Sequence, residues 1–349
     1  MKLFTCDHCG NTVYFENAVC ERCGHQLGYL PEHNALVSLV EDGGLWSTPA
    51  FTDDAYIFCE NAHHGACNWL IRAEPGGDLY CAACRHNETI PAIADPLNLG
   101  RWQVIERAKK RLFYSLLRIG LRLETRAENP AHGLAFRFLA DTPVAPEPVL
   151  TGHESGIITI ALAEADDAER EARRTGMGEP YRTLLGHFRH EIGHHYWDLL
   201  VAGHPALARF RALFGDETGD YATALRAYYA NGAPSGWPQT HISAYATAHP
   251  WEDFAETFAH YLHITDTVEM AAAFGVRARP RDPSLAVHVD FDPYVEADIQ
   301  AIVDNWIPLA SMLNNLNRAM GHPDAYPFVL TPQVIEKLGF VHDLVHGRA

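Results

Sequence analysis

Residues 187–196 read H-F-R-H-E-I-G-H-H-Y and contain the pattern H-E-x-x-H between His190 and His194. On a helix, residues four apart lie one above the other on the same face, so these two imidazoles can bind one zinc ion. Glu191 follows the first histidine and is placed to take a proton from a water on that ion. The stretch therefore predicts a helix that carries a hydrolytic metal site.

Short β-branched segments precede this helix and helical patterns follow it. Strands are predicted at 134–139 and 156–162, followed by a helix at 166–174. The metal-site helix is predicted at 181–201, with Pro180 at its start. Further helices are predicted at 205–214, 221–230, 250–274, 294–320 and 331–346. Strands followed by many helices indicate an α+β fold.

A hydrolytic zinc ion needs a third protein ligand and an open position for water. Residues 250–263 read P-W-E-D-F-A-E-T-F-A-H-Y-L-H, and Glu252 and Glu256 lie one turn apart on one helix face. Either glutamate can reach the metal on spacing alone. Acidic residues in a first helical turn also complement the helix dipole, which is the interpretation we favour for Asp253.

The combination of H-E-x-x-H with a downstream E-x-x-x-E on a second helix resembles the gluzincin metallopeptidases. The resemblance implies that Glu252 binds zinc and that Glu256 hydrogen-bonds a ligand histidine. The string E-D-F-A-E-T-F-A is also similar to the catalytic domain of anthrax lethal factor, in which a tyrosine seven residues before the ligand glutamate faces the metal. That position is Tyr245 here, which makes it a candidate donor to the oxyanion.

Four further histidines lie near the two metal motifs. We expect them to support the fold or the ligands rather than to bind the metal: His187, His195, His260 and His263. The strand at 157–162 is a candidate edge for pairing with an extended peptide. The sequence contains no G-x-S-x-G, P-loop or G-x-G-x-x-G pattern, which disfavours the competing chemistries.

All eight cysteines lie at or before position 84. Two C-x-x-C pairs with zinc-ribbon spacing form the first group: Cys6, Cys9, Cys20 and Cys23. The second group is Cys59, Cys67, Cys81 and Cys84, and its first gap holds His63 and His64 as alternative ligands. Each group predicts a closed structural zinc site, and we disfavour disulfides or free buried thiols.

The whole chain resembles a bacterial family of zinc-binding metallopeptidases with an N-terminal zinc-ribbon region. We accordingly predict a zinc ribbon at 1–28, a second four-cysteine module at 29–90, a linker at 91–100 and a zincin-like domain at 101–349, with a short sheet and mostly helices. A basic helical pattern at 102–122 indicates a solvated face or a partner for the acidic ribbon region, where residues 1–90 carry 12 acidic and 4 basic side chains.

A net charge of −17 disfavours nucleic acid and anionic membranes as partners. The start of the chain lacks an apolar segment of signal-peptide type, so we expect a cytoplasmic protein. The expected function is a zinc-dependent peptidase with one catalytic and two structural zinc ions. Its expected partners are a peptide or protein substrate and a protein bound through the ribbons. The alternatives are a binding or regulatory protein with little turnover and a zinc hydrolase of a non-peptide amide.

Overall fold

The computed structural model describes residues 2–141, 149–171 and 183–349. The chain divides into two compact units, Met1–Arg170 and Glu171–Ala349. Small sheets and separate helices confirm the predicted α+β class. Of the helix predicted at 166–174, residues 167–171 are helical, Asp166 lies just before them, and residues 172–174 lie outside the described residues, as do Pro180 and Tyr181. No helix in the described ranges is both long and apolar enough to span a membrane.

The N-terminal part of the first unit consists of short antiparallel strands. β1 pairs with β2, β3 pairs with β4, and a four-stranded sheet has the order β5-β6-β7-β8. Their apolar side chains form a small core around Leu30, Val37, Leu39, Tyr56 and Leu70. The strands are β1 (Phe4–Thr5), β2 (Thr12–Val13), β3 (Leu27–Leu30), β4 (Ala35–Ser38), β5 (Val40–Asp42), β6 (Leu45–Thr48), β7 (Phe51–Phe58) and β8 (Leu70–Arg72).

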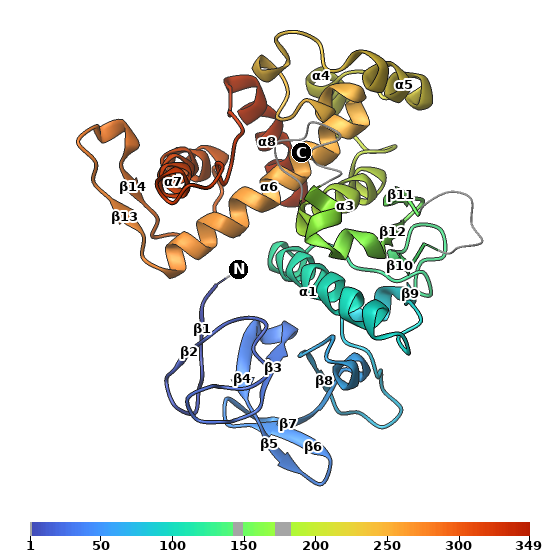
Figure 1. The fold of residues 1–349 in the computed structure, drawn as a ribbon, viewed down its shortest axis with the longest axis vertical. Helices are drawn as coiled ribbons and strands as arrows, with labels where there is room; N and C mark the ends of the chain where they lie inside the picture. The colour runs from blue at the N-terminus through green and yellow to red at the C-terminus, as the bar shows by residue number, and fades with distance from the viewer. Residues whose placement is uncertain (1, 142–148, 172–182) are drawn as a thin grey trace. The chain divides into compact units, whose positions relative to one another are not determined.

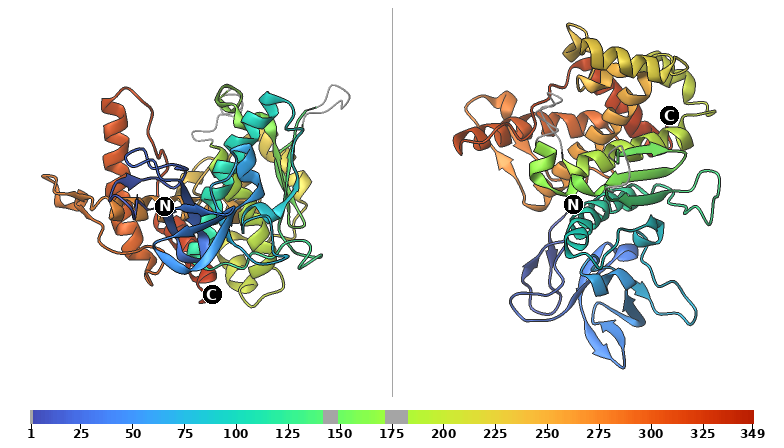
Figure 2. Two further views of the ribbon diagram at one scale, coloured as in Figure 1. Left: turned by 90° about the horizontal axis from the view of Figure 1, so that it is seen from below. Right: turned by 45° about the vertical axis from the view of Figure 1, so that its right-hand side comes forward.

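The rest of the first unit is a mixed sheet and one long helix, α1 (Pro96–Ile119). The sheet has the order β11-β12-β10-β9, in which β10 lies parallel to both of its neighbours and β11 is antiparallel to β12. Phe113 of α1 packs on Phe136 of β10, with ring centroids 5.9 Å apart, so the helix lies along the sheet (Figure 2). These strands are β9 (Asn87–Thr89), β10 (Ala135–Leu139), β11 (Gly152–Glu154) and β12 (Ile157–Ala161).

The segment predicted as a linker, 91–100, is helical from Pro96 onward. Asp95 caps α1 by accepting a hydrogen bond from the backbone N–H of Leu97, and Pro96 occupies the first turn, where its missing N–H costs nothing. Gly100, expected to end the linker, therefore lies inside the helix. The helix ends at Gly120, whose positive φ of 81° suits a residue without a side chain.

The second unit is mostly helical. Its central helix is α6 (Pro250–Ala273), which packs against four other α-helices (Figure 1). β13 (Arg277–Ala278) and β14 (Val287–His288) form a small antiparallel pair. The helices predicted to begin at residues 294 and 331 begin at Ile299 and Pro332, because Asp298 and Thr331 cap them. The other helices are α3 (Leu184–Leu200), α4 (Leu207–Phe214), α5 (Tyr221–Asn231), α7 (Ile299–Ala319) and α8 (Pro332–Val345).

The most extensive contact between α-helices in this unit is that of α3 with α6, and a glycine makes their approach possible. A Cβ atom on Gly193 would lie 3.0 Å from the Cα atom of Ala255 and 3.2 Å from the Cβ atom of Phe258. Any side chain at Gly193 would therefore push the helices apart. Because Gly193 lies inside H-E-x-x-H, the contact fixes the distance between the metal motif on α3 and the glutamates on α6.

Candidate metal centres

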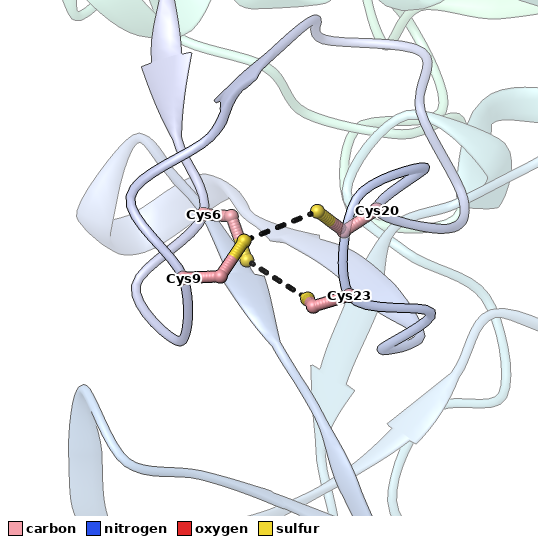
Figure 3. Close-up of side chains that lie close together, drawn as sticks. All are labelled: Cys6, Cys9, Cys20 and Cys23. Atoms are coloured by element: carbon pink, nitrogen blue, oxygen red, sulfur yellow. Dashed lines mark hydrogen bonds between the residues drawn. The ribbon is translucent and has the colours of Figure 1, made fainter.

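The first cysteine group lies on two loops that face each other (Figure 3). Sγ of Cys6 is 3.8 Å from that of Cys23, and Sγ of Cys9 is 3.6 Å from that of Cys20. A disulfide requires about 2.05 Å, whereas four thiolates around zinc at about 2.3 Å have edges of roughly 3.8 Å. All four sulfur atoms lie within 4.8 Å of one another, which fits one tetrahedral ion.

The second cysteine group also converges. The four sulfur atoms lie within 4.8 Å of one another, and Sγ of Cys67 is 3.7 Å from that of Cys81. Neither His63 nor His64 belongs to this group of ligand atoms, and His63 is exposed. The four thiols alone therefore supply a full tetrahedral donor set.

Helix α1 places three charged side chains beside the second cysteine group. Lys110 Nζ lies 3.5 Å from Cys84 Sγ and donates to Glu106 Oε2 at 2.7 Å and to the carbonyl of Ala66 at 3.0 Å. Lys109 donates to Glu106 Oε1 at 2.8 Å. Burial opposes the charge of Lys110, but the thiols and Glu106 outweigh it and raise its pKa well above the usual value.

These positions correct one part of the prediction for the basic helix. Lys109 and Lys110 are buried, so they do not belong to a solvated face. Their charges are compensated by Glu106 instead, since buried charges are stable only when paired. Arg111 meets Glu16 of the ribbon region at 2.5 Å, in line with the alternative that the helix is a partner for that acidic region.

The third group lies between α3 and α6, in the second unit. Nε2 of His190 is 3.1 Å from Nε2 of His194, and the two nitrogens are 3.0 and 3.5 Å from Oε2 of Glu252. Zinc with nitrogen and oxygen ligands at about 2.0–2.1 Å has tetrahedral edges of roughly 3.3 Å. Oε2 is buried and accepts no well-aligned hydrogen bond from the described residues, so the donor set fits one ion and supplies three of the four ligands that a tetrahedral ion takes.

Glu256 contacts His190 through the ring nitrogen, Nδ1, that does not face the other ligand atoms. His190 Nδ1 donates to Glu256 Oε1 at 2.7 Å, and Ser243 donates its hydroxyl to Oε2 at 2.6 Å. Burial raises the pKa of Glu256, but these hydrogen bonds outweigh it and the net pKa is lowered. An ionised Glu256 keeps the proton of His190 on Nδ1 and leaves Nε2 free to bind a metal.

Glu191 and Tyr245, the two predicted catalytic residues, do not belong to the ligand group. Glu191 is largely buried on α3, with 8% of its surface exposed. Tyr245 lies in a short helix, η6 (Tyr245–Ala248), with its ring centroid 5.9 Å from that of His190. Burial and the charge of Glu252 raise the pKa of the Tyr245 phenol, which therefore keeps its proton.

Two aromatic residues of this site were missed by sequence reasoning. The Trp251 ring packs on the His194 ring with a centroid distance of 3.7 Å. Tyr221, on α5, donates its hydroxyl to Glu252 Oε1 at 2.5 Å. Trp251 lies next to Glu252 in the chain, so the motif itself was a signal. Tyr221 lies 31 residues before Glu252 and has no pattern that links it to the metal.

The remaining polar candidates have other partners. His187, His195, His260 and His263 are absent from the ligand group, and His260 Nδ1 lies 2.7 Å from the Tyr326 hydroxyl. Asp253 does lie in the first turn of α6, but its carboxylate is buried and pairs with Lys337 at 2.5 Å. This buried ion pair, which holds α8 against α6, was not expected from the sequence.

Comparison with known proteins gives two family matches. Residues 98–344 match the family described as "Putative zinc-binding metallo-peptidase", and residues 3–95 match a zinc-ribbon domain. The chain is similar to uncharacterized proteins of Mycobacterium bovis and Mycobacterium tuberculosis, each 42% identical over 99% of this chain and 95% of the relative. No solved structure matches. The two family matches meet between residues 95 and 98, inside the compact unit that ends at Arg170.

Proposed function

This chain belongs to the zinc-binding metallo-peptidase family, and on that premise we propose that it is a gluzincin-type peptidase that hydrolyses peptide bonds. The observation that carries the proposal is the convergence of three ligand atoms, from His190, His194 and Glu252, on one point. Structural zinc sites have four protein ligands, whereas catalytic sites have three and a water. Family membership supports zinc as the ion, and the donor set supports hydrolysis.

The chain's own residues then divide the work. Zinc, when bound, lowers the pKa of its water toward neutrality and polarises the scissile carbonyl. Glu191 accepts a proton from the attacking water and later returns it to the leaving amine nitrogen. Glu256 holds His190 in the tautomer that exposes Nε2. Tyr245, whose phenol keeps its proton, donates a hydrogen bond to the developing oxyanion.

The two cysteine groups carry structural zinc, so we propose three zinc ions per chain, two of them structural. We retain residues 1–28 and 29–90 as two separate modules and 101–349 as the peptidase domain. The substrate is a peptide or protein, and the ribbon region recognises a protein partner. The strand β12 pairs on both sides, with β10 and with β11, so the prediction that it offers a free edge to an extended peptide is wrong. The eight unpaired cysteines favour a reducing compartment and thus a cytoplasmic location.

The decisive experiment compares the wild-type protein with Glu191→Gln on a broad peptide library, with new chain ends identified by mass spectrometry. The variant keeps all three ligands of the site, so its zinc content should equal that of the wild type. Its cleavage rate should fall by about 10²–10⁴-fold, because the base is lost.

Cleavage by Glu191→Gln near the wild-type rate would contradict the mechanism. A wild-type protein that holds three zinc ions and cleaves no peptide would instead favour a binding or regulatory role. Hydrolysis of small non-peptide amides that depends on Glu191, without peptide cleavage, would identify the third alternative.

A further inference from the structure

We infer that Tyr221 is a positioning residue for the metal centre, which fixes Glu252 as a ligand through one carboxylate oxygen. The inference rests on the zinc site of the proposed function and adds a residue outside both metal motifs. It follows from where the two oxygens of Glu252 lie and from how the Tyr221 ring is held.

The carboxylate of Glu252 has a different neighbour on each oxygen. Oε2 lies 3.0 and 3.5 Å from Nε2 of His190 and His194, and Oε1 accepts the hydroxyl of Tyr221 at 2.5 Å. Glu252 is 1% exposed, so its carboxylate has little contact with bulk water. Hydrogen bonds to an ionised acceptor are about twice as strong as neutral ones. The phenol therefore stops the carboxylate from rotating and exchanging its oxygens.

This contact also preserves the open position of the site. A carboxylate can bind a metal through one oxygen or through both. With Oε1 engaged by Tyr221, only Oε2 remains for the ion, and the fourth position stays available for water. The hydroxyl thus favours the catalytic arrangement over a closed one in which Glu252 supplies two ligand atoms.

The Tyr221 ring packs against two aromatic rings that lie just before Glu252 in the chain. It meets the rings of His249 and Trp251 edge to face, with centroids 5.3 and 5.6 Å apart. Asp220 caps α5 by accepting the backbone N–H of Thr223 at 3.1 Å, so Tyr221 is the first residue of a defined helix. The packing of the ring and the cap of the helix therefore hold the Tyr221 hydroxyl in one position relative to Glu252.

Tyr245 does not duplicate this role. Among the described residues its hydroxyl has no hydrogen-bond partner, and its ring packs against His190 and against Tyr228 of α5. One tyrosine is thus committed to a ligand and the other has a hydroxyl that a substrate can use. This division assigns metal affinity to Tyr221 and transition-state stabilisation to Tyr245.

The test is Tyr221→Phe in the full-length protein, with zinc as the probe and a chromophoric chelator as competitor. Loss of a hydrogen bond to a metal ligand typically weakens metal binding about 10–100-fold. The third zinc should therefore bind about 10–100-fold more weakly, while the two cysteine-bound ions are unaffected. Peptide hydrolysis should return toward the wild-type kcat at saturating zinc. The unfolding temperature without the third zinc should not change, because the ring and its packing remain.

The matched control is Tyr229→Phe, on the same helix but with a side chain that is 64% exposed and makes no hydrogen bond to Glu252 among the described residues. This control should bind zinc like the wild type. Equal zinc affinity in Tyr221→Phe and wild type would overturn the inference and leave the proposed function standing. A lower unfolding temperature of the zinc-depleted Tyr221→Phe protein would also overturn it, in favour of a purely structural role. Absence of a third zinc from the wild type would overturn both.

Discussion

The cysteine sites and the histidine–glutamate site differ in how their ligands are brought together. Each cysteine site takes its ligands from loops less than 30 residues apart in the chain, and tight turns aim the thiols. The third site joins two turns of α3 to the first turn of α6, more than 50 residues later. The geometry of the cysteine sites is set by the spacing of nearby residues in the sequence. The geometry of the histidine–glutamate site depends on how two helices pack. Substitutions should therefore affect zinc binding differently at the four-cysteine sites and at the three-ligand site.

The largest expected effect is loss of an entire ion. Glu252→Ala should bind two zinc ions per chain instead of three, because two histidines alone hold zinc poorly, while both cysteine sites stay loaded. Elemental analysis of the purified proteins measures this directly. A variant that retains three ions would show that Glu256 or another residue is the third ligand. A wild-type protein with a single zinc would refute the pair of cysteine sites.

The next largest effect concerns the stability of the second cysteine site relative to the first. Lys110→Met should lower the free energy of unfolding by about 3 kcal/mol, because Glu106 and the second group of thiolates lose a fully buried cation. The second cysteine site should then lose zinc to a chelator before the first does. Arg107→Met, an exposed position on the same helix, is the control and should change stability by less than about 0.5 kcal/mol. Equal zinc loss from both sites would show that Lys110 does not support the second one.

The smallest effect distinguishes a ligand from the residue that orients it. Glu256→Ala should retain the third zinc with about 10–100-fold weaker affinity, since His190 loses the acceptor of its Nδ1 proton. Chelator competition on this variant and on Glu252→Ala gives the ranking. If Glu256→Ala were the variant that loses the ion completely, the ligand would have been assigned one turn too early.

The cysteine sites and the histidine–glutamate site also differ in how much of each can be predicted from the sequence. The cysteine spacing and the 3.6-residue pattern of α3 and α6 are local signals, and most helices lie within a few residues of their predicted bounds. H-E-x-x-H is also local, because i and i+4 on a helix are neighbours whatever the fold. The glutamate on α6 required a resemblance to a known family, since spacing alone allowed Glu252 or Glu256.

Tertiary contacts account for what was missed. Tyr221 reaches Glu252, and Lys337 reaches Asp253, only because helices distant in the chain pack together. Lys109 and Lys110 belong to a pattern typical of an exposed basic helix, yet both are buried beside Glu106 and the second cysteine group. Side-chain identity cannot distinguish a solvated lysine from a buried paired one, because burial is set by the neighbouring module.

The contact of Gly193 with Ala255 has a consequence for which ions the third site selects. Because Gly193 has no side chain, α3 lies so close to α6 that even a Cβ atom at this position would come within 3.0 Å of the Ala255 Cα atom. The ligand atoms therefore keep separations of 3.0–3.5 Å before any ion arrives. Calcium, which needs six to eight oxygen ligands at about 2.3–2.6 Å, finds too few donors in so small a frame. The close approach at Gly193 thus helps to set a ligand spacing and a donor number that suit a four-coordinate ion such as zinc.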